Sequence, residues 1–403
     1  MSGPKNIKAS KVRPTSERGL EKRALQGGEQ GGDKPLPEER RKLGITCSKG
    51  MVLWLLRNRC SLAFTSYRTG QLFLVGVTPK GALSFHQRDF KMAMGLWTDA
   101  ASQSLYLATH YQIWRLENIL RPGELANEHH DRCYHPRQSL LTGDLQVHDV
   151  GVEKDGRIVF VNTAYSCLAV PDPVHSFRPL WKPPFISELT SDDRCHLNGL
   201  AMEAGHPRYV TAVSRSDVAR GWRDERSEGG LILDVTTNTV VTESLSMPHS
   251  PRLHKGRLYV LDSGRGKLCH VDRTTGMIEP IAFCPGFLRG LAFHNDHAIV
   301  GLSLPGTRSF AGLELDRTLK KKRTDPWCGV QIVDLKSGEV AEWIRLAGDA
   351  DELFDVAVLP NVRCPMALDF VSRDIEGTHS FPAEYAGMKT LAAADALAAS
   401  AAE

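Results

Sequence analysis

Three residues with oxygen-bearing side chains stand at the heads of similar short apolar segments of this sequence. They are Asp149 in DVGV, Asn198 in NGLA and Asp355 in DVAV. Carboxylate and carboxamide oxygens are the ligands that hard cations prefer. The three residues therefore form a candidate site for a divalent cation, calcium or magnesium.

Histidines lie beside these positions. His148 precedes Asp149, His249 precedes Ser250, and His196 lies two residues before Asn198. An imidazole has an unperturbed pKa of about 6.5 and can exchange protons near neutral pH. We therefore take His148 and His249 as the candidate acid–base catalysts.

Arg289 heads another segment of the same kind, RGLA. Its guanidinium would repel a divalent cation, but it matches the geometry of a carboxylate or phosphate. This pattern predicts a binding site for a small anionic ligand. The candidate ligand-binding residues are Arg289, Ser250, His196, Asn162, Asp262 and Trp222.

The elements that position these residues are short strands. Apolar runs such as Gln71–Thr78 and Arg157–Thr163 recur about every ten residues and are separated by Gly, Asp, Asn and Pro. This texture is typical of an all-β protein. A single short helical segment is expected at Gly50–Arg57.

The strands repeat in groups of four. The block Ser250–Phe283 divides into four strands, and its opening recurs six times along the chain, at intervals of 39 to 66 residues. Four-stranded propeller blades typically take ~40–50 residues. The openings are Met94, Asp149, Asn198, Ser250, Arg289 and Asp355. We predict a six-bladed β-propeller.

The two ends of the repeat complement each other. Ser61–Phe90 reads as strands two to four of a blade, and Asp355–Pro360 reads as a lone first strand. Joining them closes the ring and hides its strand edges. The predicted propeller spans residues 46–372. A polar segment, 1–45, precedes it and is predicted to be disordered, and an Ala-rich C-terminal tail, 373–403, follows.

The first strand of each propeller blade lines a central channel, so the six openings are expected to converge at one mouth. The longest connections are predicted to surround that mouth, where function concentrates on loops held by a rigid scaffold. These connections are Arg121–Val147, Lys182–Leu197, Arg215–Gly229 and Leu304–Cys328.

The mouth residues have three interpretations. In the first, they form a polar channel wall in which Asp–Arg pairs join neighbouring blades. In the second, they form a ligand or substrate site without a metal. In the third, they form a metal site. An Asp149–Arg289 or Asp355–Arg289 pair would favour the first interpretation, and converging oxygen atoms would favour the third.

Composition narrows the function classes. A net charge of +3 argues against a protein built to bind nucleic acid. No apolar run approaches the ~18 residues of a membrane span, so no membrane partner is expected. Nine cysteines without CxxC spacing or an export signal predict reduced thiols and a cytoplasmic protein.

Several stretches carry a resemblance, among them PPFISELTSDDRCHLNGLA, SMPHSPRLHKGRLYVLDSGRGKL and ELFDVAVLP. The sequence resembles an uncharacterised, mainly bacterial family of conserved hypothetical proteins that is defined by a domain of unknown function. The resemblance spans Lys49 to Phe370 and implies the propeller fold without implying an activity.

A more distant similarity is to gluconolactonase-like and strictosidine-synthase-like six-bladed propellers. Their metal-binding enzymes place an asparagine in a PNGLA-type motif, which implies Asn198 as a ligand with Asp149 or Asp355 as its companion. Leu197 replaces the proline of that motif.

Three functions follow from these observations. The first is a propeller that binds a small anionic ligand or a protein on its long-loop face. The second is a metal-dependent hydrolase of the lactonase or esterase type, in which an ion polarises the ester carbonyl. The third is a purely structural scaffold.

Overall fold

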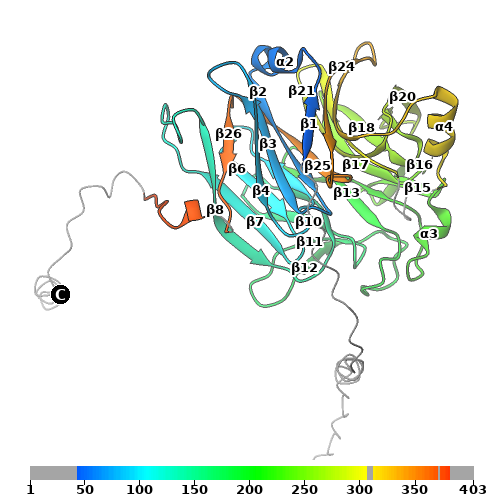
Figure 1. The fold of residues 1–403 in the computed structure, drawn as a ribbon. Coiled ribbons are helices and arrows are strands. Elements are labelled where there is room, and N and C mark those ends of the chain that lie inside the picture. Colours follow the sequence, from blue (N-terminus) through cyan, green and yellow to red (C-terminus); the bar gives the residue numbers. More distant parts are fainter. Residues whose placement is uncertain (1–42, 306–311, 371–372, 382–403) are drawn as a thin grey trace, which may run out of the picture. The chain divides into compact units, whose positions relative to one another are not determined.

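The structure is a computed structural model that describes residues 43–305, 312–370 and 373–381. Six mainly antiparallel sheets follow one another around a central axis, as predicted (Figure 1). Most of the predicted N-terminal tail and the Ala-rich end of the C-terminal tail lie outside the described residues. Gly44 and Ile45 are exceptions, because they belong to a strand. That strand begins two residues before the predicted start of the propeller at residue 46.

Each sheet contains one blade. Its four strands lie side by side, from the strand at the channel to the strand at the outside of the ring. From the inside out, blade 1 is β25 (Leu353–Pro360), β2 (Cys60–Ser66), β3 (Gln71–Val77) and β4 (Leu83–Asp89). Blade 2 is β5 (Leu96–Thr98), β6 (Ser104–Ala108), β7 (Gln112–Asn118) and β8 (Arg132–Leu141). Blade 3 is β9 (Val147–Val152), β10 (Ile158–Asn162), β11 (Cys167–Val170) and β12 (Arg178–Trp181).

The second half of the ring follows the same plan. Blade 4 is β13 (Leu197–Glu203), β14 (His206–Ala212), β15 (Gly230–Asp234) and β16 (Thr239–Leu245). Blade 5 is β17 (Pro248–His254), β18 (Arg257–Asp262), β19 (Lys267–Val271) and β20 (Ile278–Phe283). Blade 6 is β21 (Phe287–His294), β22 (His297–Ser303), β23 (Cys328–Asp334) and β24 (Val340–Ala347).

The ring closes as the sequence predicts. Strand β25, from the C-terminal part of the chain, pairs antiparallel with β2, from the N-terminal part, with Cys60 opposite Pro360 and Phe64 opposite Val356. The first blade is thus built from both ends of the propeller. Closure leaves no inner strand edge exposed.

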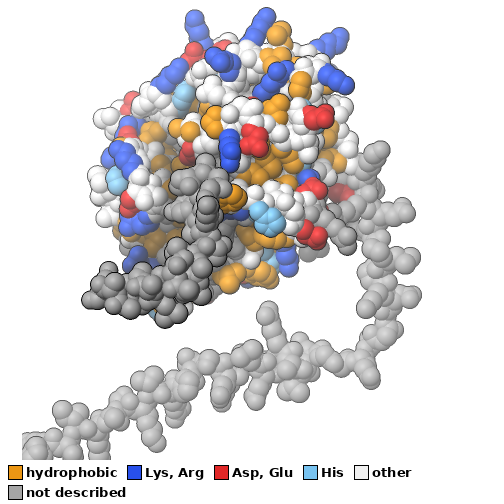
Figure 2. Space-filling view, turned by 90° about the vertical axis from the view of Figure 1, so that its left-hand side faces the viewer, with side chains coloured by type: hydrophobic (Ala, Val, Ile, Leu, Met, Phe, Trp, Pro, Cys, Tyr) orange, Lys and Arg blue, Asp and Glu red, His pale blue; other side chains and the backbone are white. Residues whose placement is uncertain are grey.

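Two strands that the repeat did not predict cover outer edges. Strand β1 (Gly44–Cys47) pairs antiparallel with β24, and β26 (Pro365–Ala367) pairs parallel with β8. Each strand satisfies backbone groups that an edge strand would otherwise leave open. Figure 2 shows the side of the ring on which β8 and β26 lie in Figure 1; apolar side chains alternate there with charged ones, and Lys and Arg side chains gather along the upper rim.

Short helices complete the described chain. Helix α2 (Met51–Asn58) matches the predicted segment and buries Met51, Trp54 and Leu55. Helix α3 (Trp222–Glu225) and helix α4 (Glu314–Lys322) interrupt two of the predicted long loops. The 3₁₀ turns are η1 (Ser263–Arg265) and η2 (Arg373–Ile375). No helix among the described residues is long and apolar enough to cross a membrane.

The core lies between neighbouring blades. Strands β2, β3 and β23 read as nearly continuous buried runs because both faces of each strand pack against another sheet. The Phe64 and Phe73 rings, 5.2 Å apart, pack with residues of β25 in the same cluster. This packing fixes the inner strands that carry the candidate site.

One loop prediction is wrong. Strand β8 runs through the segment Arg121–Val147, and residues 119–131 connect the third and fourth strands of blade 2. Strands alternate in direction, so this connection lies on the face opposite the mouth, where Asp131 donates its backbone N–H to the carbonyl of Cys364 (3.2 Å). The loops 182–196, 213–229 and 304–327 do connect fourth to first or second to third strands. We call their side the long-loop face and the other side the short-turn face.

Candidate functional site

The inner strands bring the predicted residues to the channel. Asp149 lies on β9, Asn198 on β13, Ser250 on β17, Arg289 on β21 and Asp355 on β25, and all five are buried. The sixth opening differs, because Met94 precedes β5 and packs in an apolar cluster between blades.

Three of these side chains join neighbouring blades through backbone amides. The Asp355 carboxylate accepts the Leu96 N–H (2.9 Å). The Asp149 carboxylate accepts the Leu200 N–H (2.9 Å), and the Ser250 hydroxyl accepts the Gly290 N–H (3.0 Å). These contacts link blade 1 to 2, blade 3 to 4 and blade 5 to 6. Channel residues therefore help to hold the ring together.

Arg252 bridges the two channel aspartates. Its guanidinium lies 2.7 Å from Asp149 Oδ2 and 3.6 Å from Asp355 Oδ1, and it also donates to the backbone carbonyls of Leu200 and Leu291. The expected Asp–Arg pairing is present, but the expectation that Arg289 makes it is wrong. Arg252 lies two residues after Ser250 on the same strand, but an irregularity between His249 and Arg252 breaks the alternation there, so the period of two did not reveal it.

Electrostatics in the channel follow from burial. Burial raises the pKa of the Asp355 carboxyl group, the charge of Asp149 raises it further, and Arg252 opposes both. The carboxylates also accept backbone N–H groups of Val150 and Val356. Their oxygen atoms thus already have donors.

Asn198 faces a different set of partners. Its Oδ1 accepts the Thr211 hydroxyl (2.7 Å), and its Nδ2 lies 3.4 Å from His249 Nε2. No group of three His, Cys, Asp or Glu residues in the described part of the chain has the arrangement of a metal site. The side chains of Asp149, Asn198 and Asp355 each contact protein groups.

A second set of polar residues lies at the long-loop end of the channel. We call His148, His196, His249, Arg289 and Glu352 the mouth cluster. Arg289 Nη1 lies 2.7 Å from Glu352 Oε1, and both side chains are less than 10% exposed. Glu352 lies in the loop before β25 and is not at a repeat opening, so the repeat pattern could not reveal it.

Arg289 also lies over apolar surface. Its guanidinium carbon is 4.8 Å from the centre of the Phe354 ring. Burial lowers the pKa of Arg289, and Glu352 opposes this shift. Even a lowered arginine pKa leaves the guanidinium charged at neutral pH.

His148 and His249 have matching surroundings on two blades. His148 Nδ1 lies 2.8 Å from the Gln146 carbonyl, and His249 Nδ1 lies 2.8 Å from the Met247 carbonyl. A carbonyl accepts only, so Nδ1 carries the proton in each neutral ring and Nε2 is left as an acceptor. In both cases, Nδ1 also lies near a hydroxyl that donates to the next blade, from Thr163 or Ser263.

Burial keeps both rings neutral. It lowers the pKa of His148 well below the usual range, and His196 and Arg289 lower it further. Burial lowers the pKa of His249 in the same way, with Arg289 adding to the effect. His148 therefore offers an Nε2 lone pair near a guanidinium, whereas Nε2 of His249 already faces the Asn198 amide.

His196 differs because it has a carboxylate partner. Its Nδ1 lies 3.0 Å from Asp193 Oδ2, and the Trp222 indole N–H donates to the same oxygen (2.9 Å). The His196 ring packs on Trp222 with centres 4.3 Å apart and meets His148 edge-on at 5.0 Å. A carboxylate-oriented imidazole is the arrangement of a general base. Asp193, which was not predicted from the sequence, precedes His196 by three residues.

The other candidates have local partners. Asn162 accepts the Tyr165 N–H (3.1 Å) within its own turn. Asp262 pairs with Arg265 (3.0 Å) and accepts the Ser246 N–H. Burial raises the pKa of the Asp262 carboxyl group. Trp222, by contrast, reaches the mouth cluster from its second-to-third loop through the His196 ring.

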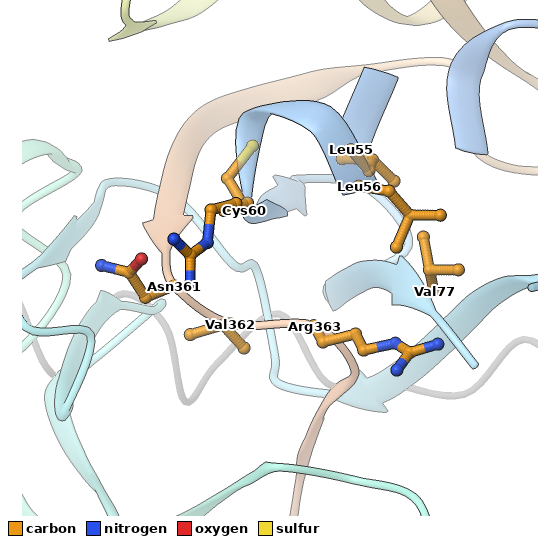
Figure 3. A pocket seen from close by; sticks show the side chains of 8 residues that line it. Leu55, Leu56, Cys60, Val77, Asn361, Val362 and Arg363 are labelled. Carbon is orange, nitrogen blue, oxygen red and sulfur yellow. The ribbon is translucent and has the colours of Figure 1, made fainter. Parts of the chain in front are cut away.

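Two cavities lie towards the short-turn face. One, of about 350 Å³, is the other end of the channel. Most of its lining residues are apolar, and the polar ones are Thr98, Asp99, Arg252 and His254. The other, of about 240 Å³, lies between α2 and the segment after β25 (Figure 3). Neither of these two cavities is lined by residues of the mouth cluster.

Comparison with known proteins identifies a family whose function is unknown. Residues 49–368 match the family model described as a domain of unknown function (DUF4915). No curated protein matches the chain in sequence.

Solved structures similar to the chain include two propeller-sized chains. One, from a structure of a nidogen/laminin complex, has a TM-score of 0.47 and 11% identity, covering 76% of this chain and 100% of that one. The other is virginiamycin B lyase from Staphylococcus aureus, with a TM-score of 0.38 and 8% identity, covering 79% and 99%. Identities this low transfer no function.

Proposed function

Because the chain belongs to the DUF4915 family, a domain of unknown function, we propose a function from its own geometry: it binds a small organic anion at the mouth cluster. The observation that carries the proposal is the convergence of Arg289 with His148, His196 and His249. A buried guanidinium attracts a carboxylate or phosphate more strongly than an exposed one because little water screens it.

The histidines narrow the chemistry of the ligand. His148 and His249 are neutral, and Nε2 of each ring is an acceptor. Because Nε2 of His249 faces the Asn198 amide, it is Nε2 of His148 that suits a hydroxyl donor rather than further negative charge. The ligand class that fits both features is a hydroxylated acid. Burial of the whole cluster favours a small molecule over a protein partner, since a protein surface could not reach these side chains.

The Asp193–His196 pair adds a capacity for proton transfer. His196 is held by the carboxylate through Nδ1, which leaves Nε2 to meet a bound molecule. A metal-dependent hydrolase is the weaker proposal, because Arg252 occupies the space between the carboxylates that would hold the ion.

Isothermal titration with gluconate tests the proposal, with sorbitol as the matched polyol without a charge. We expect saturable binding of gluconate and none of sorbitol. The double variant Arg289→Gln/Glu352→Gln removes both partners of the buried pair, which avoids a lone buried charge, and should weaken gluconate binding about tenfold or more.

Arg215→Gln is the control, because Arg215 is an exposed arginine on the long-loop face that pairs with Glu243. Equal gluconate affinity in the double variant and in Arg215→Gln would refute the proposed site. Titration with calcium, magnesium and zinc completes the test: stabilisation by an ion that disappears in Asn198→Ala would favour the hydrolase instead.

We further propose that the protein works in a reducing compartment, the bacterial cytoplasm. All nine cysteines lie within the described residues and are free thiols, and eight of them are buried. Thiol trapping in intact cells should find all nine reduced, whereas a trapped disulfide would contradict this placement.

A further inference from the structure

The cavity between α2 and the segment after β25 combines apolar walls with cations. Leu55, Leu56, Val77 and Val362 line it together with the buried Cys60 (Figure 3). Burial raises the pKa of the Cys60 thiol to about 12, so the sulfur is a neutral part of the wall. The interior is thus suited to an aliphatic chain.

Two arginines and an amide complete the lining. Arg59, Arg363 and Asn361 are exposed, and they frame the apolar walls. The Arg59 side chain has no hydrogen bond or ion pair with another described residue. Arg363 donates to the carbonyls of Thr78 (3.1 Å) and Pro79, which holds its guanidinium at the cavity.

Nearby negative groups are already engaged. The Asp131 carboxylate accepts the backbone N–H groups of Arg363 and Cys364, each at 2.8 Å. The carbonyls of Leu55 and Leu56 at the C-terminal end of α2 accept the Arg59 N–H. An anion in the cavity would therefore be attracted by two guanidinium groups, while the nearby carboxylate and carbonyl oxygens already accept hydrogen bonds from the protein.

The frame of the cavity is rigid. Arg59 and Asn361 both have left-handed backbone, with φ of 51° and 58°, and the Asn361 N–H donates to the Arg59 carbonyl (2.7 Å). Non-glycine residues adopt this conformation at a cost and keep it where the surroundings impose it. The two residues follow α2 and β25, so the cavity lies where the ring is closed.

We propose that this cavity binds a medium-chain aliphatic carboxylate, with its chain against the leucines and valines and its carboxylate between Arg59 and Arg363. A ~150 Å³ cavity holds the six carbons of benzene, so 240 Å³ suits about ten non-hydrogen atoms, the size of octanoate.

Such a ligand would contact both ends of the propeller at once, because Leu55, Cys60 and Val77 come from its N-terminal part and Val362 from its C-terminal part. A ligand that binds only the closed ring stabilises it by mass action. Octanoate should therefore raise the melting temperature, and above its dissociation constant the rise should grow with the logarithm of the octanoate concentration.

The test is calorimetric titration and thermal unfolding of the full chain with octanoate, 1-octanol and octylamine. We expect the order octanoate, then octanol, with octylamine weakest. Arg59→Gln/Arg363→Gln should lower the octanoate affinity about tenfold or more and leave octanol unchanged. The control Arg57→Gln, at an exposed arginine on α2 that does not line the cavity, should change the octanoate affinity less than about twofold.

Octanol binding as tightly as octanoate would overturn the proposal, as would octanoate affinity that is unchanged in Arg59→Gln/Arg363→Gln. Loss of octanoate binding in Arg289→Gln/Glu352→Gln would place the ligand at the mouth cluster instead. If Arg59→Gln/Arg363→Gln fails to fold, Leu56→Asp, at a half-exposed cavity residue, should abolish octanoate binding, and retained binding would reject the site.

Discussion

At the scale of single residues, Arg252 separates two interpretations of the channel. Repeat spacing predicted that Asp149 and Asp355 would face the channel, and they do. Repeat spacing could not predict which arginine pairs with these two aspartates, because the pairing depends on which long side chain crosses the channel axis. Arg252 crosses it, whereas Arg289 turns to Glu352.

The first residue-scale prediction concerns this bridge. Arg252→Met should destabilise the protein by about 3–5 kcal/mol, because it leaves buried carboxylates without their partner. Adding Asp149→Asn and Asp355→Asn to Arg252→Met should recover a large part of the loss. Urea unfolding at pH 7 measures both. A loss below about 1 kcal/mol for Arg252→Met would show that the bridge is not a structural element.

The second residue-scale prediction is a pH dependence from His148 and His249. Both pKa values are lower in the folded protein than the usual value of about 6.5, so the unfolded chain binds more protons below that pH. Their contribution to stability is present above pH 6.5 and is lost as the pH falls.

The measurement is the free energy of unfolding between pH 5 and pH 7.5. The slope of this free energy against pH should be smaller in His148→Gln/His249→Gln than in the wild type. The difference should be up to ~1.4 kcal/mol per pH unit for each ring. Asp355, with its raised pKa, acts in the opposite sense in both proteins and cancels in the comparison. An identical slope in wild type and variant would contradict the assignment of neutral, buried rings.

At the scale of elements, the sequence predicted the strands far better than the connections. Strand positions follow from apolar runs and glycine-rich turns, which are local signals, so β3 and β10 end within one residue of the predicted runs Gln71–Thr78 and Arg157–Thr163. The side on which a loop lies depends on counting strands correctly. One missed strand, β8, placed residues 121–131 on the wrong face.

Strand β26 and the Asp193–His196 pair were missed for related reasons. A three-residue strand such as Pro365–Ala367 has too short a pattern to stand out from a loop. Asp193 lies in a long loop that has no repeat to align it. Its pairing with His196 arises from a loop conformation in which both residues have left-handed backbone.

The prediction at this scale concerns the closing strand. Leu359 on β25 is fully buried among residues of blades 1 and 2, so Leu359→Ala should cost about 2–5 kcal/mol. Val340→Ala, at a half-exposed position on β24, is the control and should cost less than about 0.5 kcal/mol. Equal midpoints of urea unfolding for the two variants would show that β25 does not contribute to the core.

At the scale of the whole molecule, six blades hold a ring of inner strands whose two ends differ. The long-loop end carries the mouth cluster, and the short-turn end carries a mainly apolar cavity of about 350 Å³. The repeat predicted the ring and its closure, because both follow from the number and spacing of the similar segments along the chain. It could not predict which end would gather Glu352 and Asp193, since neither lies on a repeated strand.

The central claim is that the long-loop end binds a small organic anion. A crystal structure of the protein grown with saturating gluconate tests it most directly. We predict the gluconate carboxylate within about 2.7–3.2 Å of the Arg289 guanidinium, with a hydroxyl group directed at Nε2 of His148. An empty mouth with gluconate bound elsewhere, or a metal ion between Asp149 and Asp355 with Arg252 displaced, would contradict the claim.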